Sequence, residues 1–167
     1  MKSQFMPKRI ILILLIVSQL TMTLVGCSAS ESKGGFSVIL ADTGESLLTE
    51  SDIKAYHADT NSLELNTSGI SKWNSQLIYQ DAPKLEDSMF GREFIIEIEG
   101  KEVGRGKLWS NASSSTFLGL VILDALGRLD NANNTLWIQS GYPNTGTLPP
   151  TISSELIRYF EKQDKIK

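Results

Sequence analysis

The clearest hydrophobic pattern in the chain is an alternation of apolar and polar positions, which predicts β-strands. Phe94, Ile96 and Ile98 occupy every second position, with two glutamates among the residues between and after them. A Gly100-Lys101 turn then leads into a second run, Val103 to Trp109. Two runs of this kind around a short glycine turn are typical of a β-hairpin with one buried face.

The charges of the second run constrain how the two strands of this hairpin pair. A strict two-residue turn would place Arg105 and Lys107 on the same face as Phe94, and two cations would be buried. A shift by one residue moves both cations to the other face, because successive side chains alternate between faces. We therefore expect a three-residue loop or a β-bulge near Gly104–Gly106. The expected cross-strand pairs are Glu97 with Arg105 and Ile95 with Lys107.

The remaining apolar runs predict further short strands and two helices. We expect strands over 36–41, 62–66, 117–124 and 135–142, with 117–124 central because it is the most apolar, and a weaker extended piece over 52–56. Apolar residues at helical spacing predict one helix from Thr67 or Ser68 to about Tyr79, and another over 151–163 with Ser153 or Ser154 as its cap. This order predicts a single α+β domain, mainly an antiparallel sheet with two helices packed on one face.

The first 26 residues follow a different pattern, which is typical of an export signal. Basic residues come first, an almost unbroken apolar run over 10–20 follows, and small residues precede Cys27. Polar residues interrupt the apolar stretch, so it falls short of the roughly 20 apolar residues that a spanning helix prefers. We predict that residues 1–26 are a cleaved signal peptide.

The quartet Leu24-Val25-Gly26-Cys27 resembles the lipobox of bacterial lipoproteins, and Cys27 is the only cysteine in the chain. The resemblance implies that a signal peptidase recognises Leu24, Val25 and Gly26, and that the Cys27 thiol carries diacylglycerol. Lipid on Cys27 would then anchor the chain at the extracytoplasmic face of the cell membrane, or at an outer membrane if the cell has one. The alternative is an uncleaved N-terminal anchor that merely contains a cysteine. We read 27–35 as a lipidated flexible tether and 36–163 as the domain.

Composition narrows the class of partner. The leader holds Lys2, Lys8 and Arg9 and no acidic residue, so 13 of the 16 basic residues and all 19 acidic residues remain in the 141-residue mature chain, a net charge of −6. Nucleic acid is an unsuitable partner for such a chain, because affinity for it comes largely from basic contacts to phosphate. One histidine and a blocked cysteine cannot form the usual zinc site, and no cofactor is indicated.

Several segments together resemble the head of the first periplasmic domain of SecD/SecDF. They are Leu63-Glu64-Leu65 followed by Thr67-Ser68-Gly69-Ile70, the hairpin FIIEIEGKEVGRG and the strand GLVILD, and they cover roughly Ile53 to Asp124. The resemblance implies that fold, an outward face that meets emerging polypeptide, and no hydrolase activity. It does not extend to a motor role, since the transmembrane helices and proton path of SecD have no counterpart in this sequence.

One motif suggests catalysis. Asp42-Thr43-Gly44 follows an apolar strand, as the catalytic triplet of aspartic proteases does, and Leu126-Gly127-Arg128 is similar to a later segment of retropepsins. In those enzymes two carboxylates share one proton. Glu45 departs from that pattern, because a small residue is usual there. The alternative is a turn that ends the strand, where aspartate, threonine and glycine are all common.

Three further groups each have a functional and a structural interpretation. His57 is either a general base or a surface or capping residue. The run Ser110–Thr116 either offers hydroxyls to a ligand beside Trp109 as a stacking plate, or is a solvated loop with Trp109 in the core. Asp130, Asn131, Asn133 and Asn134 either hold calcium or form a tight turn, and they lack the EF-hand spacing. We expect the structural interpretation of each, and so no catalytic and no metal-binding residue.

These patterns together predict a lipid-anchored, extracytoplasmic, noncatalytic binding or accessory protein of the bacterial cell envelope. Its partners would be the membrane, through the lipid, and a protein or other envelope component. Two alternatives remain: an envelope-attached hydrolase that uses Asp42, and a structural subunit of an envelope assembly.

Overall fold

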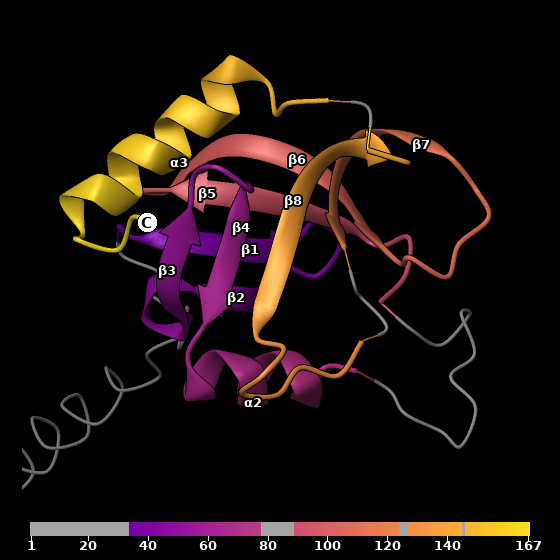
Figure 1. The fold of residues 1–167 in the computed structure, drawn as a ribbon, viewed down its shortest axis with the longest axis horizontal. Coiled ribbons are helices and arrows are strands. Elements are labelled where there is room, and N and C mark those ends of the chain that lie inside the picture. Colours follow the sequence, from indigo (N-terminus) through magenta and orange to yellow (C-terminus); the bar gives the residue numbers. More distant parts are fainter. Residues whose placement is uncertain (1–33, 78–88, 124–126, 145) are drawn as a thin grey trace, which may run out of the picture. The chain divides into compact units, whose positions relative to one another are not determined.

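Within the described residues, eight strands form one curled sheet in the order β2-β1-β5-β6-β7-β8-β4-β3 (Figure 1). The computed structural model describes residues 34–77, 89–123, 127–144 and 146–167, so the predicted leader, Cys27 and most of the tether lie outside the described residues. The strands are β1 (Phe36–Leu40), β2 (Ser46–Thr49), β3 (Ile53–His57), β4 (Ser62–Leu65), β5 (Glu93–Ile98), β6 (Lys101–Trp109), β7 (Phe117–Leu123) and β8 (Thr135–Tyr142). The helices are η1 (Glu50–Asp52, a 3-10 turn), α2 (Thr67–Ser75) and α3 (Pro150–Lys162).

The predicted fold class is confirmed: this is an α+β domain whose sheet is mainly antiparallel. The exception is the pair β6–β7, which is parallel, and β7 is central as expected. Parallel neighbours usually need a crossover of a dozen or more residues, whereas here residues 110–116 suffice. Gly106 permits this close pairing, because a Cβ at that position would lie 2.0 Å from the carbonyl oxygen of Leu120.

The β5–β6 hairpin contains the expected bulge, but the cross-strand pairs differ from the prediction. Glu99 and Gly100 both have positive φ (51° and 77°) and form a strict two-residue turn that pairs Ile98 with Lys101. The register then shifts by one residue beside Val103, which is the bulge. Val103 directly precedes Gly104, so the bulge predicted near Gly104–Gly106 is confirmed. The predicted pairs are wrong, because the bulge adds only one residue to a turn that stays tight. The observed pairs are Ile95 with Arg105 and Glu93 with Lys107.

The predicted faces of this hairpin are nevertheless confirmed. Arg105 is exposed, whereas Leu108 is buried together with Phe94. A bulge anywhere between the turn and Arg105 has this effect, because it reverses which face every later side chain occupies.

Both helices add side chains to the one large core, although they lie at opposite ends of the curled sheet (Figure 1). Trp73 of α2 and Leu156 and Phe160 of α3 are fully buried in the same cluster as the strand residues. This agrees with two helices packed on one face of the sheet.

The predicted helix caps were wrong. Asn66 caps α2, because its Oδ1 accepts the backbone N–H of Gly69 at 3.0 Å. That helix ends at Ser75 rather than near Tyr79, which lies outside the described residues. Pro149 precedes α3 without a side-chain cap, and the hydroxyls of Ser153 and Ser154 donate to backbone carbonyls one turn back.

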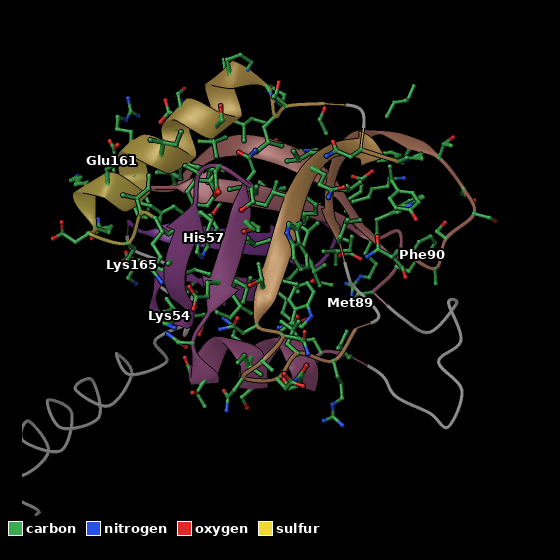
Figure 2. The ribbon with its side chains drawn as sticks, in the orientation of Figure 1. Lys54, His57, Met89, Phe90, Glu161 and Lys165 are labelled. Atoms are coloured by element: carbon green, nitrogen blue, oxygen red, sulfur yellow. The ribbon has the colours of Figure 1, made fainter. Side chains whose placement is uncertain are left out.

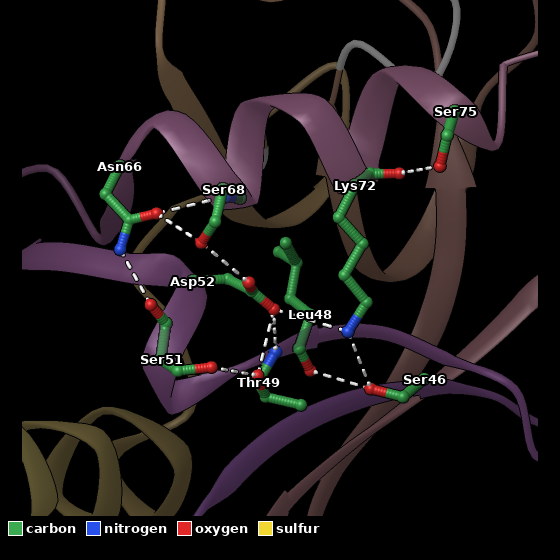
Figure 3. Close-up of polar contacts among 10 residues, drawn as sticks. Ser46, Leu48, Thr49, Ser51, Asp52, Asn66, Ser68, Lys72 and Ser75 are labelled. Carbon is green, nitrogen blue, oxygen red and sulfur yellow. Dashed lines mark hydrogen bonds and ion pairs between the residues drawn. The ribbon is translucent and has the colours of Figure 1, made fainter.

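The two edge strands of the sheet, β2 and β3, are consecutive in the chain and are joined by η1. The buried Asp52 carboxylate accepts hydrogen bonds from the backbone N–H and the hydroxyl of Thr49, both at 2.9 Å, and from Ser68 and Lys72 of α2 at 3.3 Å (Figure 3). On the other side, Glu50 accepts from the Tyr159 hydroxyl of α3. The turn therefore holds both helices against the sheet edges.

A substitution at Gly69 tests whether α2 packs closely against η1. A Cβ there would lie 2.4 Å from the backbone oxygen of Asp52, so Gly69→Ala forces α2 away from η1. We expect the free energy of unfolding, measured by denaturant titration, to fall by about 1–3 kcal/mol. Ser71→Ala, at an exposed position of the same helix, is the control and should leave stability nearly unchanged. Equal stability of the two variants would contradict the close contact between α2 and η1.

Candidate functional site

The Asp42-Thr43-Gly44 triplet forms the turn between β1 and β2. Gly44, at φ 70°, donates its backbone N–H to Leu40 at 2.9 Å. Nη2 of Arg92 contacts both oxygens of the exposed Asp42 carboxylate, at 3.0 and 3.1 Å. The hydrogen bond from this guanidinium lowers the pKa of Asp42.

This geometry favours the turn interpretation of Asp42. A carboxylate pair that shares a proton needs two carboxyl groups in contact. The ion-pair partner of Asp42 among the described residues is a guanidinium and not a second carboxylate. Leu126, part of the other retropepsin-like segment, lies outside the described residues.

His57 belongs to a charged cluster around Glu64 at the β3–β4 hairpin. Its Nε2 lies 3.1 Å from Glu64 Oε2, while Lys54 and Lys167 contact the same carboxylate at 2.6 and 3.1 Å. Figure 2 places Lys54 and His57 along β3. Hydrogen bonds from Lys54 and then Lys167 lower the pKa of Glu64 to about 2. Among the described residues, His57 bonds to this carboxylate and not to a serine. Because Lys167 binds the same carboxylate, the cluster connects the hairpin to the C-terminal residue.

The other two groups also have structural surroundings. Trp109 is only 8% exposed, and its ring packs against Phe90 and Phe117 at centroid distances of 4.7 and 5.5 Å. It belongs to a second, smaller core and cannot serve as an open stacking plate. One Asp130 oxygen accepts the backbone N–H groups of Ala132 and Asn133 at 2.8 Å, which is a turn.

The exposed tryptophan on the sheet is Trp137, which the sequence reasoning missed. Its neighbours Leu136 and Ile138 point into the core, so Trp137 points outward from β8 and is 38% exposed. It borders a groove of about 430 Å³, and the described lining residues are Gly127, Arg128, Leu129, Ala132, Asn133, Thr135 and Trp137. We call this the Trp137 groove. The alternation of residues 135–138 was the signal that could have identified it.

Hydrogen bonds hold the wall of the Trp137 groove in place. The Asn74 side chain of α2 accepts the N–H of Leu129 at 2.9 Å and donates to its carbonyl at 2.8 Å. Asn134 donates to the carbonyl of Leu65 at 3.0 Å. The segment opposite Trp137 is therefore fixed to both α2 and β4, and the groove is preformed.

No family model, curated protein or solved structure matches this chain. The SecDF resemblance therefore stays a prediction. Within the described residues, no helix is both long and apolar enough to cross a membrane.

The Glu64 cluster predicts acid sensitivity. The pKa of Glu64 falls from 4.5 to about 2 on folding, so its stabilisation is present above pH 4.5 and is lost as the pH falls through that interval. Denaturant unfolding across the interval should show a smaller loss of stability for Glu64→Gln than for the native chain. Glu161→Gln, on the exposed surface of α3 (Figure 2), should keep the native pH dependence. An unchanged pH dependence in Glu64→Gln would contradict this role.

Proposed function

We propose that the chain is a lipid-anchored extracytoplasmic protein of the bacterial cell envelope that binds a partner and is not itself an enzyme. The predicted lipid on Cys27 attaches it to the outer side of the cell membrane, or to an outer membrane. The domain over 36–163 then meets a protein or another envelope component. The SecDF resemblance implies a polypeptide as that partner.

The Trp137 groove is the observation that carries the binding role. Tryptophan is enriched among the residues that contribute most to binding, and Trp137 is 38% exposed beside a groove of about 430 Å³. That size lies within the usual range for ligand pockets. A preformed wall lowers the entropy lost on binding, since the segment opposite Trp137 is already ordered.

The surroundings of Asp42 and His57 support a noncatalytic role. A general base or nucleophile needs a free reactive atom near the substrate. The Asp42 carboxylate binds Arg92, and His57 contacts Glu64 within a cluster that holds the C-terminal residue. Both side chains therefore make local contacts that stabilise the fold.

Affinity capture from envelope extracts tests the proposal. The full chain should recover a partner, and Trp137→Ala should weaken its binding about 30-fold, the equivalent of about 2 kcal/mol for a central binding residue. Leu118→Ala, at an apolar side chain that is 87% exposed on β7, is the matched control and should bind as the native chain does.

Two results would contradict the proposal. Equal recovery of the partner by the native chain and Trp137→Ala would exclude the groove as the binding site. Proteolysis with an acid optimum that Asp42→Asn abolishes would establish the hydrolase alternative instead.

A further inference from the structure

A second pocket lies between the β1–β2 turn, the C-terminal half of α2 and the segment before β5. Its volume is about 380 Å³, and the described lining residues are Leu40, Glu45, Ser46, Lys72, Ser75, Gln76, Met89 and Arg92. We call it the Lys72–Arg92 pocket. It shares no described lining residue with the Trp137 groove, so it is a separate site.

Lys72 reaches from α2 towards β2 and has capacity for a further hydrogen bond (Figure 3). Its Nζ lies 3.3 Å from Asp52 Oδ2 and 3.3 Å from Ser46 Oγ, whereas strong charge-assisted bonds are about 2.7–2.9 Å long. Asp52 is also bonded by Thr49 and Ser68. The carboxylate is therefore satisfied largely without Lys72, and the ammonium has a third proton to donate.

Arg92 supplies a second cation to the pocket. Among the described residues, only Nη2 of its guanidinium makes hydrogen bonds, and both go to Asp42. A guanidinium has five N–H donors in a planar fork that suits a carboxylate. Asp42 thus orients Arg92 and leaves the other donors for a ligand.

The same pocket also contains hydrogen-bond acceptors. Oε1 of Gln76 is closed to solvent, so the accessible acceptor is the Glu45 side chain. Glu45 adds an exposed carboxylate. Leu40 and Met89, which are 1% and 4% exposed, belong to the core beneath the pocket. An inorganic anion would use the two cations, but it would be repelled by Glu45.

We propose that the Lys72–Arg92 pocket binds an α-carboxylate with an adjacent N–H group, as found in the C-terminal residue of a peptide or in a free amino acid. Lys72 and Arg92 hold the carboxylate. The exposed Glu45 carboxylate accepts hydrogen bonds from the N–H groups.

Calorimetric titration of the purified full chain tests this site with alanyl-alanine, alanyl-leucine, the C-terminal amides of both, and free alanine. The free-acid dipeptides should bind, and amidation should weaken them roughly 10- to 100-fold, because it removes the charge that Lys72 and Arg92 recognise. Tighter binding of the dipeptides than of alanine identifies a peptide terminus as the ligand, and equal binding identifies the free amino acid.

Substitutions inside and outside the pocket test whether the dipeptides bind there. Lys72→Met and Arg92→Met should each weaken the dipeptides roughly 10- to 100-fold, with near-ultraviolet circular dichroism confirming that both fold. Lys72→Met loses its contact with Asp52 and could unfold for that reason. In that case Arg92→Met still tests the proposal. Lys101→Met removes an exposed cation outside the pocket and should bind normally. Absence of binding at millimolar concentration, equal binding of acids and amides, or native affinity in Arg92→Met would overturn the proposal.

Discussion

The buried Asp52 carboxylate is the contact on which the rest of the domain depends. Burying a carboxylate is unfavourable unless hydrogen bonds and charge compensate, and burial alone would raise the pKa of Asp52. Hydrogen bonds from Thr49, helped by the charge of Lys72, outweigh this effect and lower it. Because Asp52 lies in the turn that joins the two edge strands, the same bonds hold α2 and both sheet edges together. They also set the position of Lys72 at the second pocket.

Local patterns were sufficient to predict most of the sheet. Alternation identified the hairpin, and the charges of Arg105 and Lys107 predicted a change of register before the bulge was seen. Strand β2 was missed because its four residues contain two consecutive buried leucines, which give no alternation. The parallel β6–β7 pair was also missed, because it depends on the approach of the Leu120 backbone to Gly106, which no local pattern reports.

For the candidate sites, the sequence identified individual residues, and only the tertiary structure showed what surrounds them. A short motif singled out Asp42, and residue type singled out His57 and Trp109; each of them has structural neighbours in the fold. Trp109 and Trp137 are the same residue type, but Trp109 is buried in a small core that includes Phe90 and Phe117, whereas Trp137 is 38% exposed. The network that places Lys72 beside Asp52 joins residues 20 positions apart, so it could not be recognised before the helix and turn were placed together.

The two proposed binding sites can act in the envelope only if lipid displays the domain there, so the state of Cys27 is the most direct test of the whole account. Mass spectrometry of the chain extracted from membranes should find a mature protein that begins at Cys27 and carries the added mass of diacylglycerol. An uncut chain that begins at Met1 and has a free Cys27 thiol would contradict the account.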